Sequence, residues 1–138
     1  MKSIKNIVFA GILALGAFLT LTNTSCTKDS STSASQYVKN WAASDTVNSN
    51  HWSYTCNITA GTTTTTLVID TNFANHFFLH PISATFSGNN IVIPAQIPDN
   101  DGYQVAGSGV FANNKIRWTY VITDTSTSTS NSVVGTWQ

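Results

Sequence analysis

Three histidines are the residues of this chain whose type could support metal chemistry. A zinc site takes nitrogen or sulfur ligands in a tetrahedral arrangement, and the candidates are His51, His76 and His80. His76 and His80 are four residues apart, a spacing that places two ligands on one face only in a helix. The flanking Phe77 and Pro81 favour an extended chain, in which the rings stand about 13 Å apart. We therefore predict no metal site.

The segment Asp-Asn-Asp-Gly at positions 99–102 resembles part of a calcium loop. It offers side-chain oxygens and a turn glycine, but a complete EF-hand loop also ends in a bidentate glutamate. The chain contains no glutamate. We predict a polar turn and no cofactor, with a calcium site assembled from separate loops as the open alternative.

Nucleophilic catalysis needs a nucleophile, a base and an orienting group in one place. The chain has no Gly-x-Ser-x-Gly elbow, and Gly107-Ser108-Gly109 is too short and lies within a strand pattern. Cys56 falls on an apolar strand face, where a thiol is inert. We predict that the protein is not an enzyme, and we keep a secreted hydrolase as the least favoured alternative.

Aromatic side chains are the best candidates for ligand contacts. Trp52 and Trp118 lie on apolar strand faces, so they are expected in the core, where such rings bury large areas. Trp41 and Trp137 occupy less regular positions. We predict these two as exposed rings that contact a ligand.

The elements that must position these residues are strands. Trp52, Tyr54, Cys56 and Ile58 alternate with polar residues, and the same period of two recurs along the chain. Turn clusters such as positions 87–90, 98–102 and 112–114 separate the runs. The strand expectations are 37–47, 52–58, 62–69, 76–86, 91–93 (stopped by Pro94), 103–111, 116–123 and 133–137, with a Ser/Thr-rich loop at 124–132.

Short links between about eight short strands predict an all-β domain with an antiparallel meander, either a barrel or a sandwich. Gly107 and Gly109 on one strand face suggest a bend or a close backbone approach. Scarce helix formers and abundant Thr, Val and Ile agree with this fold class. We place the β domain at 36–138.

Composition excludes one class of partner. Beyond position 25 the chain has four basic and six acidic residues, a formal charge of −2. Nucleic-acid binding depends on several Lys or Arg neutralising phosphates, so we predict no nucleic-acid partner.

The N-terminus has the pattern of an export signal. Lys2 and Lys5 precede an uncharged apolar run at 7–21, and Cys26 follows the small residue Ser25. The run is short for a membrane span, which needs about 20 residues, although a permanent anchor is the alternative. We assign 1–25 to the signal and the polar stretch 26–35 to a flexible tether.

Cys26 after a signal resembles the lipidated cysteine of bacterial lipoproteins, in which it becomes the acylated N-terminus. Asn23 stands where that motif usually has Leu, so ordinary cleavage near Ser25 remains an alternative, as does a Cys26–Cys56 disulfide in an unlipidated protein. Thr27, Lys28 and Asp29 resemble the start of surface lipoproteins from Bacteroidetes. The resemblance implies an outer-membrane or cell-surface protein held by a lipid anchor.

Two further resemblances concern the β domain. The runs 91–96 and 107–109, followed by Ile116 to Tyr120, resemble a group of small Bacteroidetes lipoproteins with no activity to transfer. The meander and Gly135-Thr136-Trp137 resemble lipocalin-like barrels in architecture. Asp45-Thr46-Val47 is similar to the Bacteroidetes O-glycosylation acceptor, which makes Thr46 a candidate modification site.

Together these patterns predict a monomeric cell-envelope lipoprotein that serves as a non-enzymatic binding or structural module. The alternative is a lipocalin-like carrier of a small apolar ligand or a glycan.

Overall fold

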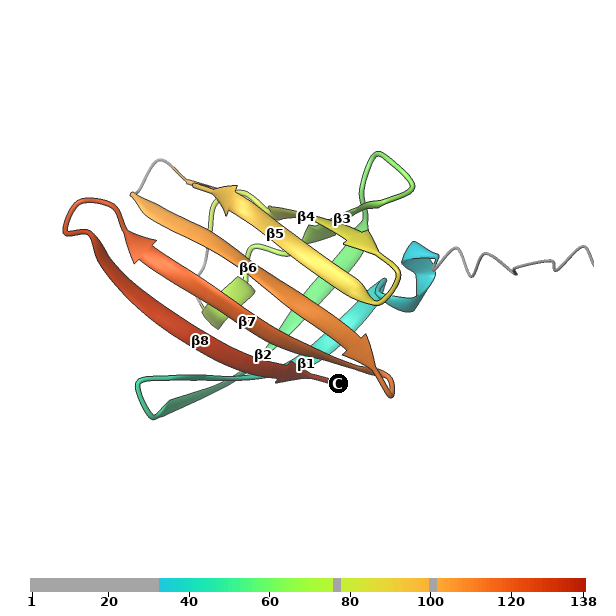
Figure 1. Ribbon diagram of the computed structural model, residues 1–138, viewed down its shortest axis with the longest axis horizontal. Helices are drawn as coiled ribbons and strands as arrows, with labels where there is room; N and C mark the ends of the chain where they lie inside the picture. The colour runs from blue at the N-terminus through green and yellow to red at the C-terminus, as the bar shows by residue number, and fades with distance from the viewer. Residues whose placement is uncertain (1–32, 76–77, 100–101) are drawn as a thin grey trace, which may run out of the picture.

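The computed structural model describes residues 33–75, 78–99 and 102–138 of the 138-residue chain. Eight antiparallel strands follow one another in sequence order, and the last strand pairs with the first to close a barrel (Figure 1). The elements are η1 (Ala34–Gln36), β1 (Lys39–Val47), β2 (Asn50–Ala60), β3 (Thr66–Ile69), η2 (Phe73–Asn75), β4 (Ile82–Ser87), β5 (Asn90–Gln96), β6 (Tyr103–Ala112), β7 (Lys115–Asp124) and β8 (Thr129–Trp137).

The all-β meander is therefore confirmed, as a barrel and not a sandwich. Closure gives every strand a hydrogen-bonded neighbour on both sides, although β2 pairs with β3 only over Ile58–Ala60. The architecture is consistent with a lipocalin-like barrel.

The connections of a meander alternate between the two ends of the barrel. We call the end with η1 and the β2–β3, β4–β5 and β6–β7 connections the closed end. We call the end with the β1–β2, β3–β4, β5–β6 and β7–β8 connections the mouth. Figure 1 shows η1 and the β6–β7 turn together at one end and the β1–β2 and β7–β8 turns at the other.

Tyr37 seals the closed end. Its hydroxyl donates to the Gly88 carbonyl at 2.6 Å, and its own carbonyl accepts from Trp41 Nε1 at 2.8 Å. The Tyr37 ring centroid lies 5.0 Å from that of Phe86 and 5.5 Å from that of Phe111. An aromatic cluster thus fills this end directly after the chain enters the barrel.

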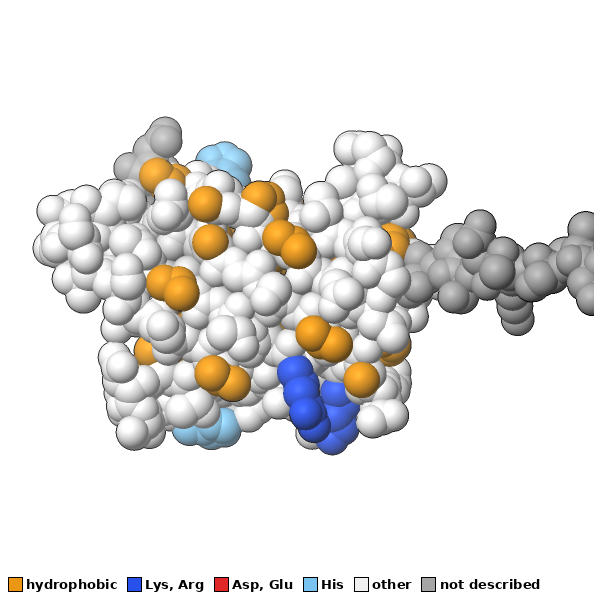
Figure 2. Space-filling model, in the orientation of Figure 1, with side chains coloured by type: hydrophobic (Ala, Val, Ile, Leu, Met, Phe, Trp, Pro, Cys, Tyr) orange, Lys and Arg blue, Asp and Glu red, His pale blue; other side chains and the backbone are white. Residues whose placement is uncertain are grey.

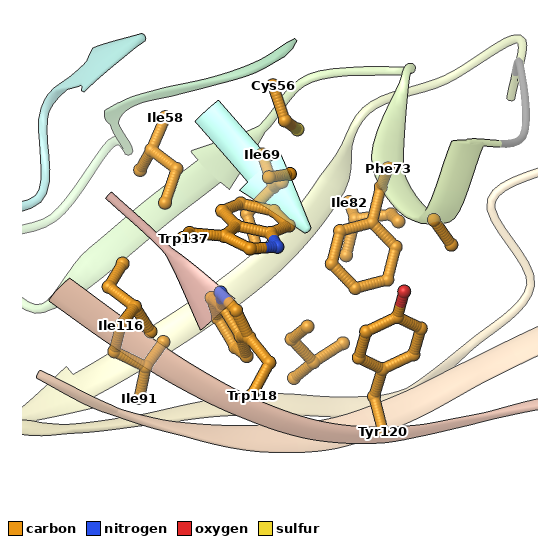
Figure 3. Close-up of a cluster of buried hydrophobic side chains, with 14 of the residues drawn as sticks. Cys56, Ile58, Ile69, Phe73, Ile82, Ile91, Ile116, Trp118, Tyr120 and Trp137 are labelled. Atoms are coloured by element: carbon orange, nitrogen blue, oxygen red, sulfur yellow. The ribbon is translucent and has the colours of Figure 1, made fainter. Parts of the chain in front are cut away.

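The barrel axis is filled by large side chains (Figure 3). Phe73, from the connection between β3 and β4, packs inside with ring centroids 4.6 Å from Tyr120 and 5.7 Å from Trp137. The ring centroids of Trp118 and Trp137 are 5.3 Å apart. Small barrels of this strand number are commonly filled by side chains in this way.

Gly107 and Gly109 make the close approach that their pattern predicted. A Cβ at Gly107 would stand 2.3 Å from the Tyr120 Cβ, and one at Gly109 would stand 2.7 Å from the Trp118 ring. The large side chains of β7 occupy the space that β6 leaves open.

Several strand boundaries differ from the prediction. β3 begins at Thr66 and not at position 62, and β8 begins at Thr129 inside the predicted Ser/Thr-rich loop. β4 begins only at Ile82. Its expected start is wrong because the amides of Leu79 and His80 donate to Asp99, and Pro81 has no amide hydrogen.

β5 continues through Pro94 to Gln96, so the predicted stop at the proline is wrong. The register with β6 shifts between Ile93 and Gln96. A bulge of this kind tolerates a proline because one residue leaves the hydrogen-bond ladder. Near the N-terminus of the domain, Ala34 and Ser35 of the predicted tether already belong to η1.

Candidate functional site

A buried carboxylate lies inside the barrel. In β1 the side chains of Trp41, Ala43, Asp45 and Val47 all point inward, and Asp45 is fully buried. Burial of an unpaired charge is very costly. The surroundings of Asp45 must therefore supply hydrogen-bond donors.

Three donors from three other strands surround this carboxylate. The Tyr120 hydroxyl donates to Asp45 Oδ2 at 2.5 Å, and the Tyr54 hydroxyl donates to the same oxygen. Trp137 Nε1 donates to Asp45 Oδ1 at 3.1 Å. Both oxygens are satisfied, and β1 is tied to β2, β7 and β8.

Gly135 makes room for this carboxylate. A Cβ at Gly135 would stand 1.9 Å from Asp45 Oδ1, nearer than any two such atoms can approach. Asp45 and Gly135 are partners across the β1–β8 ladder. The glycine therefore permits the Asp45 side chain to lie over the neighbouring strand.

Tyr54 extends the network to the β3–β4 connection. Its hydroxyl accepts a hydrogen bond from the Ala74 amide at 2.9 Å. Ala74 has φ +60° and ψ +26°, a left-handed conformation that costs a non-glycine residue about 1–2 kcal/mol. Phe73, the residue before it, is the side chain that fills the barrel axis.

The hydroxyls of Tyr54 and Tyr120 keep their protons and so act as donors to Asp45. Burial raises the pKa of Tyr54 far above its ordinary value, and the Asp45 charge raises it further. Burial also raises the pKa of Tyr120, with added contributions from Tyr54 and Asp45. Because the hydroxyls stay protonated and the cluster is enclosed, this arrangement serves packing and positioning.

Cys56 is buried on the apolar face of β2, as predicted. Burial raises the pKa of its thiol to about 12, with smaller contributions from Asp70 and Asp45. Thiolate is the reactive form of cysteine, so the Cys56 side chain is inert at neutral pH.

A cleft of about 440 Å³ opens at the mouth. Its lining includes Val47, the next inward-facing residue of β1 after Asp45. Val47, Ala74 and Val133 are buried and form its floor. The cleft is lined by Val47, Asn48, Asn50, Trp52, Ala74, Asn75, Tyr103, Ile122, Asn131 and Val133.

The lining is uncharged and combines polar amides with apolar walls. Four of the ten residues are asparagines, and Trp52 and Tyr103 add two rings, while none is a carboxylate or a cation. Asn48 Nδ2, in the β1–β2 turn, donates to Asn131 Oδ1 near the start of β8 at 3.0 Å. An asparagine amide offers two donor hydrogens and an acceptor oxygen, so the rim can hydrogen-bond a ligand in both directions.

The predicted ligand contacts at Trp41 and Trp137 need correction. Both rings are fully buried, so the expectation that they are exposed is wrong. Trp41 packs at the closed end, and Trp137 donates to Asp45. Trp52 lines the cleft instead, half-buried, although its alternating pattern placed it in the core.

Some of the remaining predicted sites lie among the residues that the structure describes, and the others lie outside them. Thr46 is exposed on β1, and its Oγ1 lies 3.4 Å from His51 Nδ1; its glycosylation stays a prediction. Cys26, the signal at 1–25 and most of the tether lie outside the described residues, as do His76, Asn100 and Asp101. Within the described ranges, no three His, Cys, Asp or Glu side chains gather as a metal site would require.

Asp99 has a structural role at the mouth. It is buried and accepts from the amides of Leu79 and His80, with His80 Nδ1 3.5 Å away. Burial raises the pKa of Asp99, but these hydrogen bonds outweigh it and hold the pKa below its ordinary value. The carboxylate thus joins the β5–β6 connection to the β3–β4 connection.

Comparison with known proteins assigns no family. No protein-family model matches the chain, and no curated protein matches it significantly. Among the described residues, no helix has the length and apolar character to span a bilayer.

Replacement of Asp45 by asparagine should destabilise the barrel. The amide presents one acceptor oxygen and one NH2 group, so a buried donor loses its partner, at a cost of about 1–3 kcal/mol. Urea unfolding of Asp45→Asn should show this loss. The exposed Asp70→Asn control should change the free energy of unfolding by less than about 0.5 kcal/mol. Equal stability of the two variants would contradict the role assigned to Asp45.

Proposed function

We propose that this protein is a lipid-anchored, non-enzymatic binding module of the bacterial cell envelope, with the mouth cleft as its binding site. The ligand class that suits the cleft is a small neutral saccharide. The observation that carries this proposal is a cleft of about 440 Å³ that combines four asparagines and two aromatic rings with an aliphatic floor and has no charged side chain.

The N-terminal pattern supports the anchor. An export signal followed by Cys26 resembles a lipoprotein leader, and acyl chains anchor a protein stably when two or more are attached. The described chain enters the barrel through η1 at the closed end. An anchor at Cys26 therefore leaves the mouth at the far end, open to ligand.

The chemistry of the cleft supports a saccharide over an apolar ligand. Binding sites combine apolar and aromatic walls with a few polar groups that fix orientation. The Trp52 and Tyr103 rings offer apolar faces to a sugar ring, and the asparagine amides match hydroxyl groups. An apolar carrier site inside the barrel is disfavoured because Phe73, Trp118 and Trp137 fill the axis.

The buried polar cluster supports binding without catalysis. Asp45 is the carboxylate nearest to the floor of the cleft along β1, yet it is fully buried. Both of its oxygens already accept hydrogen bonds from Tyr54, Tyr120 and Trp137. A general base must reach the proton that it removes, and this carboxylate is already occupied.

Lipidation is tested by metabolic labelling with an alkyne fatty acid in a bacterial host that processes lipoproteins. The wild-type protein should carry the label and fractionate with membranes. Cys26→Ala should lose both properties, because the acylated sulfur is gone. Cys56→Ala is the matched control and should keep the label. Label that persists in Cys26→Ala would refute the anchor.

Ligand binding is tested by isothermal titration calorimetry with a panel of neutral oligosaccharides and, separately, a long-chain fatty acid. At least one oligosaccharide should bind. Trp52→Ala should weaken that binding about tenfold, a loss of about 1.4 kcal/mol, because an aromatic wall is removed. Leu79→Ala, a highly exposed mouth residue that does not line the cleft, should bind as wild type does. Binding of the fatty acid alone would instead favour the apolar carrier.

A further inference from the structure

The charged side chains of the barrel are separated between its two ends. The cations in the described part of the chain are Lys39, Lys115 and Arg117. Lys39 is the first residue of β1, and Lys115 is the first residue of β7, so both begin strands at the closed end. Arg117 follows two residues later on the same outward face of β7. Figure 2 shows the Lys and Arg side chains gathered at the end of the barrel that carries η1.

The described Asp side chains lie toward the other end or inside the barrel. Asp70 follows β3, Asp99 lies in the β5–β6 connection and Asp124 is the last residue of β7, all on the side of the mouth. Asp45 is enclosed and accepts its hydrogen bonds within the barrel. The domain therefore has a positive closed end and a negative mouth, although few of its residues are charged.

We infer that the closed end docks on anionic phospholipid headgroups and holds the mouth pointed away from the membrane. This inference rests on the proposed lipid anchor, which would enter at the same end. Each Lys or Arg close to an anionic leaflet is attracted to it, within roughly one Debye length of about 10 Å. The eight residue steps from Cys26 to Ala34 would span at most about 29 Å, so the anchor allows the closed end to reach the leaflet without fixing its orientation. The cations favour contact with the anionic surface, while the carboxylates near the mouth are repelled.

The accessibility of the three cations fits this role. Lys115 and Arg117 are exposed. Lys39 is half-buried, with its Nζ 3.9 Å from the centroid of the Trp41 ring. Charge complementarity of this kind sets orientation more than affinity. The acyl chains would provide attachment, and the cations would select which end of the barrel faces the bilayer.

The test uses the lipidated full-length protein, as processed by its host, on vesicles that contain an energy-transfer acceptor lipid. Ala112→Cys places a fluorescent label at the closed end, and Thr127→Cys places one at the mouth. Both positions are exposed. The native cysteines do not interfere, because Cys26 is acylated and the Cys56 thiol is buried with its pKa raised to about 12.

On vesicles of phosphatidylcholine with added phosphatidylglycerol, energy transfer from position 112 should exceed that from position 127 by about twofold or more. The difference should shrink on phosphatidylcholine alone and at high salt, where screening shortens to about 3 Å at 1 M. The Lys115→Gln/Arg117→Gln variant should lose most of the difference, since both side chains are exposed and their removal leaves the core intact. Thr119→Gln, at an exposed and uncharged position further along β7, is the control and should keep it.

Equal transfer from the two positions on anionic vesicles would overturn the inference, and so would a difference unchanged by Lys115→Gln/Arg117→Gln. Failure of the anchor gives another result, namely loss of the protein from phosphatidylcholine vesicles. Because the inference assigns attachment to the acyl chains and orientation to the cations, loss of the protein from both kinds of vesicle refutes the anchor and, with it, the inference.

Discussion

The buried carboxylate of Asp45 is the interaction on which the rest of the barrel depends. It accepts from Tyr54, Tyr120 and Trp137, and so joins the first strand to three others. Through Tyr54 it also reaches the Ala74 amide, which belongs to the segment that places Phe73 inside the barrel. A buried charge is tolerated only where such donors are complete. The network thus couples barrel closure, core packing and the shape of the mouth.

This coupling divides the molecule into two ends with different roles. At the closed end, Tyr37 and its aromatic neighbours seal the barrel where the chain enters. At the mouth, connections that are distant in sequence converge on one neutral cleft. The β3–β4 connection is held there from two sides, by Tyr54 from below and by Asp99 from the β5–β6 connection. The loops that line the cleft are therefore held in place by the scaffold beneath them.

The strand order was predictable because alternation and turn residues are local signals. The close approach at Gly107 and Gly109 was predictable for the same reason. Asp45 was not recognised as a buried group, although it falls on the inward face of β1 between Ala43 and Val47. The charge of an aspartate normally indicates exposure, and its three donors come from positions 9, 75 and 92 residues away. Trp137 was wrongly predicted to be exposed because its hydrogen-bond partner, Asp45, is also remote in sequence. The cleft has no local sequence pattern because its lining comes from separate hairpins.

The account makes Tyr54 the bridge between the buried carboxylate and the mouth, and one measurement tests this directly. Amide hydrogen exchange, resolved residue by residue by NMR, should show the Ala74 amide protected in the wild-type protein. In Tyr54→Phe, which lacks only the hydroxyl, that protection should fall by about 3–10-fold more than that of the ladder amides of β7, the equivalent of one further hydrogen bond, because the ladder amides report only the change in global stability. An Ala74 amide that exchanges as an open loop does in the wild type, or that is unchanged in Tyr54→Phe, would contradict the account.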